Sequence, residues 1–140
     1  MYNKYMNIKR AVGIVFVLYV VDHIINIIIS KLLGIDLETQ NPANMPLVMW
    51  YCSLIILMIM STLGTAWYLN APKIVSSIKN GFLFGLTIVV FGFIASTILL
   101  LISRGGLDIL LEYYIQPQFW LAFILALIAC TLVGYIKTRK

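Results

Sequence analysis

The sequence predicts an all-α membrane protein with four transmembrane helices in an up-down-up-down bundle, and with a short interfacial amphipathic helix before the fourth span. Composition, the spacing of apolar runs and the placement of proline support this fold class. Of the 140 residues, 62% are hydrophobic and 11% are charged, whereas soluble domains are about 25% charged. A chain of this length suits one domain, taken as residues 1–140.

Each apolar run is long enough to cross a hydrocarbon core, which requires about 20 helical residues. The four spans are predicted at residues 11–33, 47–69, 81–103 and 118–136. Proline lacks the backbone N–H that a helix interior needs, and every proline lies between spans: Pro42, Pro46, Pro72 and Pro117. Tryptophans lie near span ends, as in interfacial aromatic belts: Trp50, Trp67 and Trp120.

Basic residues predict the orientation of the spans. Eight of the ten lie in the two tails and the second loop: Lys4, Lys9, Arg10, Lys73, Lys79, Lys137, Arg139 and Lys140. The other loops carry Lys31 and Arg104 with four acids: Asp36, Glu38, Asp108 and Glu112. Because Lys and Arg mark the cytoplasmic side, both termini are predicted to be cytoplasmic, in a multi-pass protein of the cell membrane. The net charge of +5 therefore indicates topology, and no nucleic-acid partner is expected.

Two connections between spans have a recognisable pattern. Gly34 is predicted to end the first helix, and Asn41-Pro42 to form a turn in an irregular external loop. Between residues 107 and 116, polar side chains repeat every fourth residue, and apolar ones occupy the opposite face: Leu107, Leu110, Leu111 and Tyr114. The polar ones are Asp108, Glu112 and Gln116. This pattern predicts an amphipathic helix in the outer interface, as a spacer or alternatively as a substrate gate.

The third span carries a stripe of small residues on one helical face, formed by Gly81, Gly85, Gly92 and Ser96. Gly81 and Gly85 match the small-x-x-x-small pattern that lets two membrane helices approach closely. The stripe predicts helix packing, either inside the bundle or at a homodimer interface.

The first span carries a polar patch of four residues, Tyr19, Asp22, His23 and Asn26, spaced so that they lie within two helical turns. Asp22 is the single acid within a predicted span, and a charge at that depth costs at least about 2.5–3.5 kcal/mol. The state of lower energy is a neutral carboxyl group bonded to Asn26 or to a hydroxyl of another helix. The candidate hydroxyls are Ser61, Thr62, Thr65, Thr87, Ser96 and Thr131.

Two interpretations of the patch remain open. It is a proton relay or the polar lining of a small solute path, or it is polar glue that fixes the register of neighbouring helices. One histidine and one central aspartate fall short of a usual ligand set, so no metal or other cofactor is expected. Cys52 and Cys130 form no metal or redox motif, which favours their being small buried apolar residues.

The sequence contains no catalytic motif of a hydrolase, a nucleotide-binding enzyme or a zinc protease. A mid-span aspartate in the first helix resembles the start of lipoprotein signal peptidases, but the second aspartate of that family has no counterpart here. An enzyme is therefore not expected. The sequence favours a small transport or channel-like unit; the alternative is a non-transporting accessory or structural subunit of a membrane complex. The expected partners are the lipid bilayer and either a second copy of the chain or a larger membrane complex.

Overall fold

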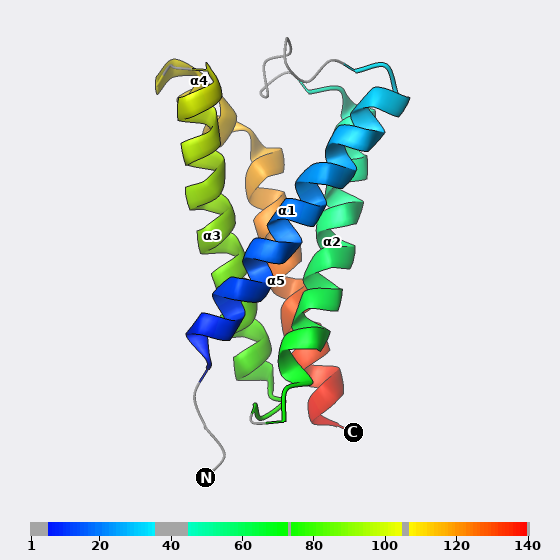
Figure 1. Ribbon diagram of the computed structural model, residues 1–140, viewed down its shortest axis with the longest axis vertical. Coiled ribbons are helices and arrows are strands. Elements are labelled where there is room, and N and C mark those ends of the chain that lie inside the picture. Colours follow the sequence, from blue (N-terminus) through cyan, green and yellow to red (C-terminus); the bar gives the residue numbers. More distant parts are fainter. Residues whose placement is uncertain (1–5, 36–44, 73, 105–106, 140) are drawn as a thin grey trace.

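The computed structural model describes residues 6–35, 45–72, 74–104 and 107–139. These residues form five helices (Figure 1): α1 (Ile8–Leu32), α2 (Leu47–Leu69), α3 (Ile78–Arg104), α4 (Leu107–Ile115) and α5 (Pro117–Thr138). All except α4 are long and apolar enough to cross a membrane. The predicted all-helical class and the four apolar helices are thus confirmed for the described residues.

Local sequence signals set both ends of α1. Asn7 caps its start, because the side-chain Oδ1 accepts a hydrogen bond of 3.1 Å from the backbone N–H of Arg10. Gly34 follows its end with a φ of +67°, a conformation that side chains with a Cβ rarely adopt. The N–H groups of Gly34 and Ile35 bond back to the carbonyls of Lys31 and Ser30 at 3.2 and 2.8 Å. This arrangement is a Schellman motif, so the predicted glycine stop is confirmed.

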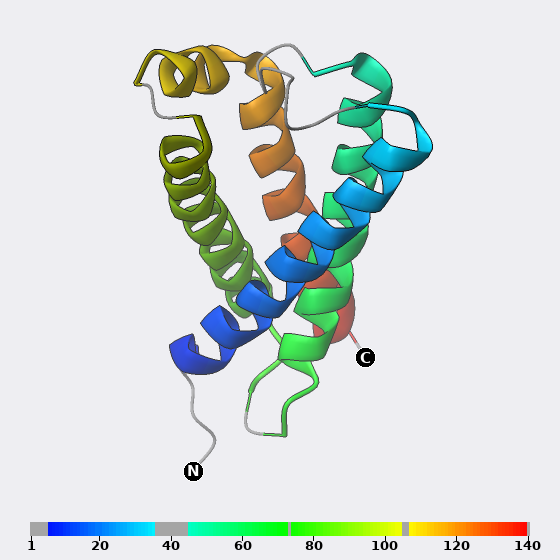
Figure 2. The same ribbon diagram turned by 45° about the horizontal axis from the view of Figure 1, so that its top comes forward.

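The four long helices alternate in direction (Figure 1), so the start of α1 and the end of α5 lie at the same, lower end of the view. The short α4 lies at the opposite end and leads from α3 into α5. When the molecule is turned (Figure 2), α3 is close to α5 at the lower end and well separated from it at the upper end. The bundle is therefore narrow at one end and splayed at the other.

A hydrophobic core fills the narrow end of the bundle. Its buried members are Ala11, Ile14, Val15, Tyr68, Leu69, Phe84, Ile88 and Cys130. The rings of Tyr68 and Phe84 stack with centroids 4.8 Å apart. The Tyr68 hydroxyl accepts a hydrogen bond of 3.0 Å from the backbone N–H of Asn7. This core joins the start of α1 to the end of α2 and the start of α3.

Two basic side chains close the narrow end around the last turn of α2. The Arg10 guanidinium donates to the Trp67 carbonyl at 3.3 Å. The Lys137 ammonium donates to the Ala66 carbonyl at 3.0 Å and also to the Asn70 side chain. Both cations lie where the carbonyls of a helix C-terminus concentrate negative charge. They therefore stabilise the end of α2 and link it to α1 and α5.

Glycines allow α3 and α5 to meet backbone against backbone. A Cβ atom at Gly81 would lie 2.5 Å from the Cys130 carbonyl oxygen and 3.0 Å from the Gly134 Cα atom. At Gly134 it would lie 2.7 Å from the Ser77 carbonyl oxygen. Gly85 is similarly close, with a Cβ position 2.9 Å from the Cys130 Cβ atom. These small residues thus pack within the chain, between α3 and α5.

The other two members of the predicted stripe lie higher on α3, where the helices separate. A Cβ atom at Gly92 would meet the Phe123 ring at an ordinary 3.5 Å, and Ser96 lines a cavity between the helices. The stripe therefore does not act as one uniform packing surface.

Large apolar side chains cover the outside of the bundle. Leu63, Ile55 and Ile124, for example, are 58%, 59% and 53% exposed. Soluble monomers rarely expose so extensive an apolar surface, whereas lipid solvates it. The four apolar helices and this surface are compatible with a multi-pass membrane protein.

Several sequence-based expectations concern residues outside the described ranges. They are the turn at Asn41-Pro42 and the charges of Lys4, Asp36, Glu38, Lys73 and Lys140.

The glycine contact predicts a marked difference between two alanine substitutions. We expect Gly81→Ala to lower the free energy of unfolding by about 1–3 kcal/mol, because its methyl group meets backbone that cannot yield locally. Gly13→Ala is the matched control, because nothing lies within 4 Å of its Cβ position. The free energy of unfolding of both variants is measured on purified protein in neutral detergent. Equal stability of the two would contradict the proposed contact.

Candidate functional site

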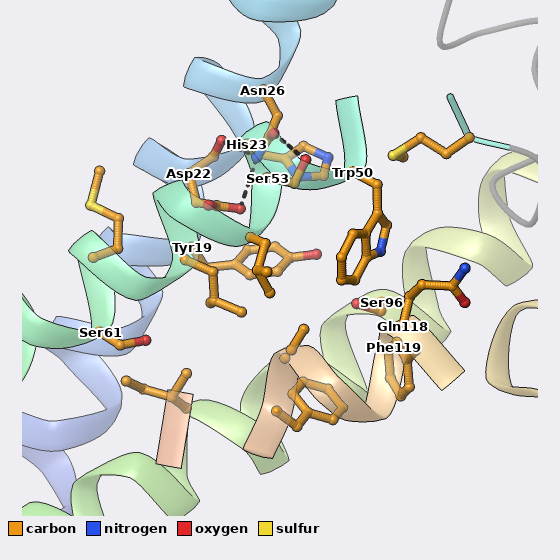
Figure 3. Close-up of a pocket in the computed structure, with 18 of the residues that line it drawn as sticks. Tyr19, Asp22, His23, Asn26, Trp50, Ser53, Ser61, Ser96, Gln118 and Phe119 are labelled. Carbon is orange, nitrogen blue, oxygen red and sulfur yellow. Dashed lines mark hydrogen bonds between the residues drawn. The ribbon is translucent and has the colours of Figure 1, made fainter. Parts of the chain in front are cut away.

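A cavity of about 350 Å³ lies within the splayed half of the bundle. Side chains of α1, α2, α3 and α5 form its walls, and Tyr113 of α4 and Gln116, which precedes α5, contribute at the α4 end. All four residues of the predicted polar patch line it: Tyr19, Asp22, His23 and Asn26. The structure therefore brings the patch of α1 together with polar and aromatic side chains of the other helices (Figure 3).

Asp22, Asn26 and Ser53 form a hydrogen-bonded chain between α1 and α2 (Figure 3). The Asn26 amide donates to the Asp22 Oδ2 atom at 3.2 Å and to the Asp22 carbonyl at 2.9 Å. The Ser53 hydroxyl lies 2.7 Å from the Asn26 Oδ1 atom and donates to it. Asn26 therefore orients the carboxyl group and is itself fixed by the neighbouring helix.

The second carboxyl oxygen of Asp22 has a different environment. The Oδ1 atom is buried, and no described residue donates a hydrogen bond to it. A buried acceptor without a donor costs about 1–3 kcal/mol, more if it is charged. Water or a ligand in the cavity can supply the missing hydrogen-bond donor.

Tyr19 and His23 form the aromatic part of the patch. Their rings stack with centroids 5.6 Å apart and an interplanar angle of 21°. Tyr19 also meets the Phe91 ring of α3 edge to face at 5.7 Å, and its hydroxyl interacts with the Ser96 side chain. Tyr19 thus connects the patch to α3 and presents both a ring face and a hydroxyl group.

α4 is held over the splayed end by an aromatic cluster. The Tyr114 ring stacks on Phe93 at 4.8 Å, and its hydroxyl lies 2.5 Å from the Thr97 hydroxyl. The Trp120 indole donates to the Tyr114 carbonyl at 2.8 Å, and Phe119 packs against the Tyr114 ring at 4.7 Å. The short helix predicted from the sequence is therefore present and is packed against α3 and α5.

Tyr113, on the same helix, reaches the cavity. Burial raises its pKa to about 12, and the neighbouring Tyr114 and Tyr19 hydroxyls add to the shift. The phenol is therefore neutral throughout the physiological range and acts as a hydrogen-bonding group. Tyr113 belongs to neither face of the amphipathic pattern predicted for residues 107–116. Leu107 and Leu111, which that pattern places on the apolar face, are exposed.

Most of the hydroxyls considered as partners for Asp22 bond within their own helices instead. The acceptors are the carbonyls four residues earlier, and the donors are Thr62, Thr65, Thr87 and Thr131. Ser61 lines the cavity, but its hydroxyl has no hydrogen-bond partner among the described residues. Of the expected partners, Asn26 bonds the carboxyl group, and the hydroxyl that supports it comes from Ser53.

Sequence reasoning missed several further lining residues: Trp50, Ser53, Gln118 and Phe119. Trp50 and Ser53 lie three residues apart on α2, and Gln118 and Phe119 lie in the first turn of α5. Polar or aromatic residues near the start of a helix are common at the membrane–water interface, so their presence in the sequence does not identify a cavity. Their role depends on which helices are neighbours.

The described residues contain no group of three or more His, Cys, Asp or Glu side chains close enough to hold a metal ion. Cys52 and Cys130 are free thiols, and the Cys130 thiol lies in the core, 3.7 Å from the Ser61 carbonyl. The side chains that line the cavity offer proton exchange, hydrogen bonding and contact with aromatic faces.

No protein-family model matches the chain, and no curated protein or solved structure is similar to it.

The link between Asn26 and Ser53 predicts an energetic coupling between α1 and α2. In a double-mutant cycle, we expect Asn26→Ala and Ser53→Ala to couple by about 0.6–1.7 kcal/mol, the range for hydrogen bonds between membrane helices. Chemical unfolding in mixed micelles gives the free energy of unfolding of the native protein, the two single variants and the double variant. The control cycle pairs Ser53→Ala with Thr62→Ala, whose hydroxyl bonds the Met58 carbonyl of its own helix. Coupling no larger than in this control would contradict the hydrogen-bonded chain.

Proposed function

We propose that the chain is a single multi-pass domain of the cell membrane that works as a small transport or channel-like unit, with the cavity beside Asp22 as its solute site. One observation carries the proposal. Asp22 and His23 lie on the wall of a cavity of about 350 Å³ inside an otherwise apolar bundle. Ionisable residues at membrane depth typically mark ion, proton or solute pathways.

The charge distribution supports an outward-facing cavity. The narrow end carries Lys9, Arg10, Lys79, Lys137 and Arg139, whereas the splayed end carries two basic residues, Lys31 and Arg104, beside two acids, Asp108 and Glu112. By the positive-inside rule the narrow end is cytoplasmic and both termini are inside. The cavity then lies in the outer half of the membrane, with α4 in the outer interface.

The geometry supports a working cycle that begins at Asp22. The carboxyl group is held by Asn26 and has one oxygen without a donor, so it can exchange a proton or bind a solute there. The core around Tyr68 and Phe84 seals the opposite end. Release to the cytoplasm therefore requires α1 to separate from α2 and α3 at that core.

The outward orientation predicts the direction from which cavity residues react. After both native cysteines are replaced by alanine, we expect Ser96→Cys to react with a membrane-impermeant thiol reagent added outside intact cells, because Ser96 lines the cavity. Asn70→Cys, exposed at the narrow end, is the control and should react only after the membrane is opened. Labelling of Asn70→Cys alone from outside would reverse the orientation.

The role of Asp22 predicts a loss of flux in a variant that keeps its shape. In liposomes with an internal pH-sensitive dye and an imposed proton gradient, we expect Asp22→Asn to reduce proton flux by about tenfold or more, because the amide cannot exchange the proton. Thr62→Ala, on the exposed face of α2, should leave the flux unchanged. An undiminished proton flux through Asp22→Asn would show that Asp22 is not part of the proton pathway.

The alternative function is a non-transporting accessory or structural subunit of a membrane complex. The observation that favours it is the Asp22–Asn26–Ser53 chain, which fixes α1 against α2. In that case the native chain conducts no protons, and Asp22→Leu lowers thermal stability. The flux measurement on the native chain therefore separates the two functions.

A further inference from the structure

A second, more open groove lies beside the cavity, between α2 and α5. Its volume is about 780 Å³, and most of its lining is apolar or aromatic, including Tyr51, Trp120, Leu121 and Ile124. These four side chains are between 45% and 58% exposed. On a helix bundle surrounded by lipid, such a groove faces the acyl chains of the bilayer.

The groove and the cavity share one wall. Leu47, Trp50, Leu54 and Gln118 line both of them. Figure 3 shows Trp50 of α2 and Gln118 of α5 on the same side of the cavity. The side-chain carbonyl oxygen of Gln118 is buried and has no hydrogen-bond donor among the described residues. A single layer of side chains, with a polar atom left unsatisfied, therefore separates the cavity from the lipid-facing groove.

The two compartments differ in chemistry. The cavity offers the Asp22 Oδ1 atom without a donor, together with the rings of Tyr19, Trp50 and Phe119. Carboxylate oxygens and aromatic faces are the groups that bind organic ammonium ions. Among the described residues that line the cavity, none is Lys or Arg, and His23 is the one basic side chain. The groove offers hydrocarbon contact alone along most of its length.

From this shared wall we infer that the cavity binds a single-chain amphiphile with an alkylammonium head, which enters sideways from the outer leaflet between α2 and α5 as the side chains of the wall move apart. The head lies beside Asp22, and the alkyl chain lies in the groove. A cation there stabilises the ionised carboxylate by its charge, and a head that carries an N–H can also donate a hydrogen bond to the Oδ1 atom. One groove accommodates one chain, which favours a single-chain amphiphile over a two-chain lipid. The inference rests on the proposed solute site and names its substrate class.

The test is binding of radiolabelled dodecyltrimethylammonium to the full chain in neutral maltoside micelles. We expect saturable binding that unlabelled dodecyltrimethylammonium displaces. Tetramethylammonium, which lacks the chain, should compete about a hundredfold less well, and dodecyl sulfate should not compete. Equal competition by all three compounds would overturn the inference.

Variants test the two compartments separately. Asp22→Asn should weaken binding about tenfold or more, and Asp22→Glu should restore part of it. Leu54→Trp places a larger side chain in the shared wall, so it should slow association of the amphiphile about tenfold. Ile59→Trp, at an exposed position elsewhere on α2, is its matched control and should leave the association rate unchanged. Gln118→Trp is a second variant of the wall. If one of the two wall variants fails to fold, the association rate of the other still tests lateral entry.

The outcomes distinguish this inference from the proposed function. If tetramethylammonium binds as tightly as the amphiphile and both wall variants associate at the native rate, lateral entry is wrong while a solute site at Asp22 stands. If no organic cation binds saturably but Asp22-dependent proton flux persists, the ligand class is wrong and the transport proposal stands. If the native chain conducts no protons, the transport proposal fails, whatever the binding result.

Discussion

The close approach of α3 and α5 at Gly81 and Gly134 is the contact from which the rest of the bundle follows. Backbone meets backbone there, so the two helices are fixed together at the narrow end. They diverge toward the other end, where α4 leads from one to the other (Figure 2). Membrane helices gain no hydrophobic driving force from one another, and close van der Waals packing takes its place. The same contact that stabilises the narrow end therefore leaves room for a cavity at the splayed end.

That room changes the meaning of the buried acid. In a fully packed bundle, Asp22 would serve as polar glue, with each oxygen paired to a neighbouring helix. Here Asn26, itself held by the Ser53 hydroxyl, donates to one carboxyl oxygen, and no described residue donates to the other. The hydrogen-bonded chain and the free oxygen are complementary, because a rigidly held carboxyl group presents its second oxygen in a fixed direction. A structural role and a binding role can thus belong to the same residue.

In the inferred binding mode, the apolar exterior takes part in ligand entry as well as in contact with lipid. The groove between α2 and α5 belongs to the lipid-facing surface, yet it shares Trp50 and Gln118 with the polar cavity. Along the inferred route, a ligand that is partly apolar reaches Asp22 through this shared wall without crossing the aqueous interface. This geometry suits molecules that partition into a leaflet before they bind.

The sequence by itself determined the four long helices and placed their ends within three residues of those observed. Proline and the Gly34 stop limit where helices can form, apolar length defines four candidate spans, and local spacing placed Tyr19, Asp22 and Asn26 on one face of α1. These features depend on the backbone and on neighbours within a few residues, which a sequence displays directly. Gly81 and Gly85 were also recognisable as packing residues, but their partner Gly134 was not. The small residues Ala126, Cys130 and Gly134 do recur every fourth position on α5, a signal that could have found it.

Only the tertiary structure decided that Ser53 rather than a threonine supports Asn26, that Tyr113 reaches the cavity, and that Trp50 and Gln118 form a shared wall. Those relations depend on which helices are neighbours and at what height they cross, and both are set by packing between residues far apart in the chain.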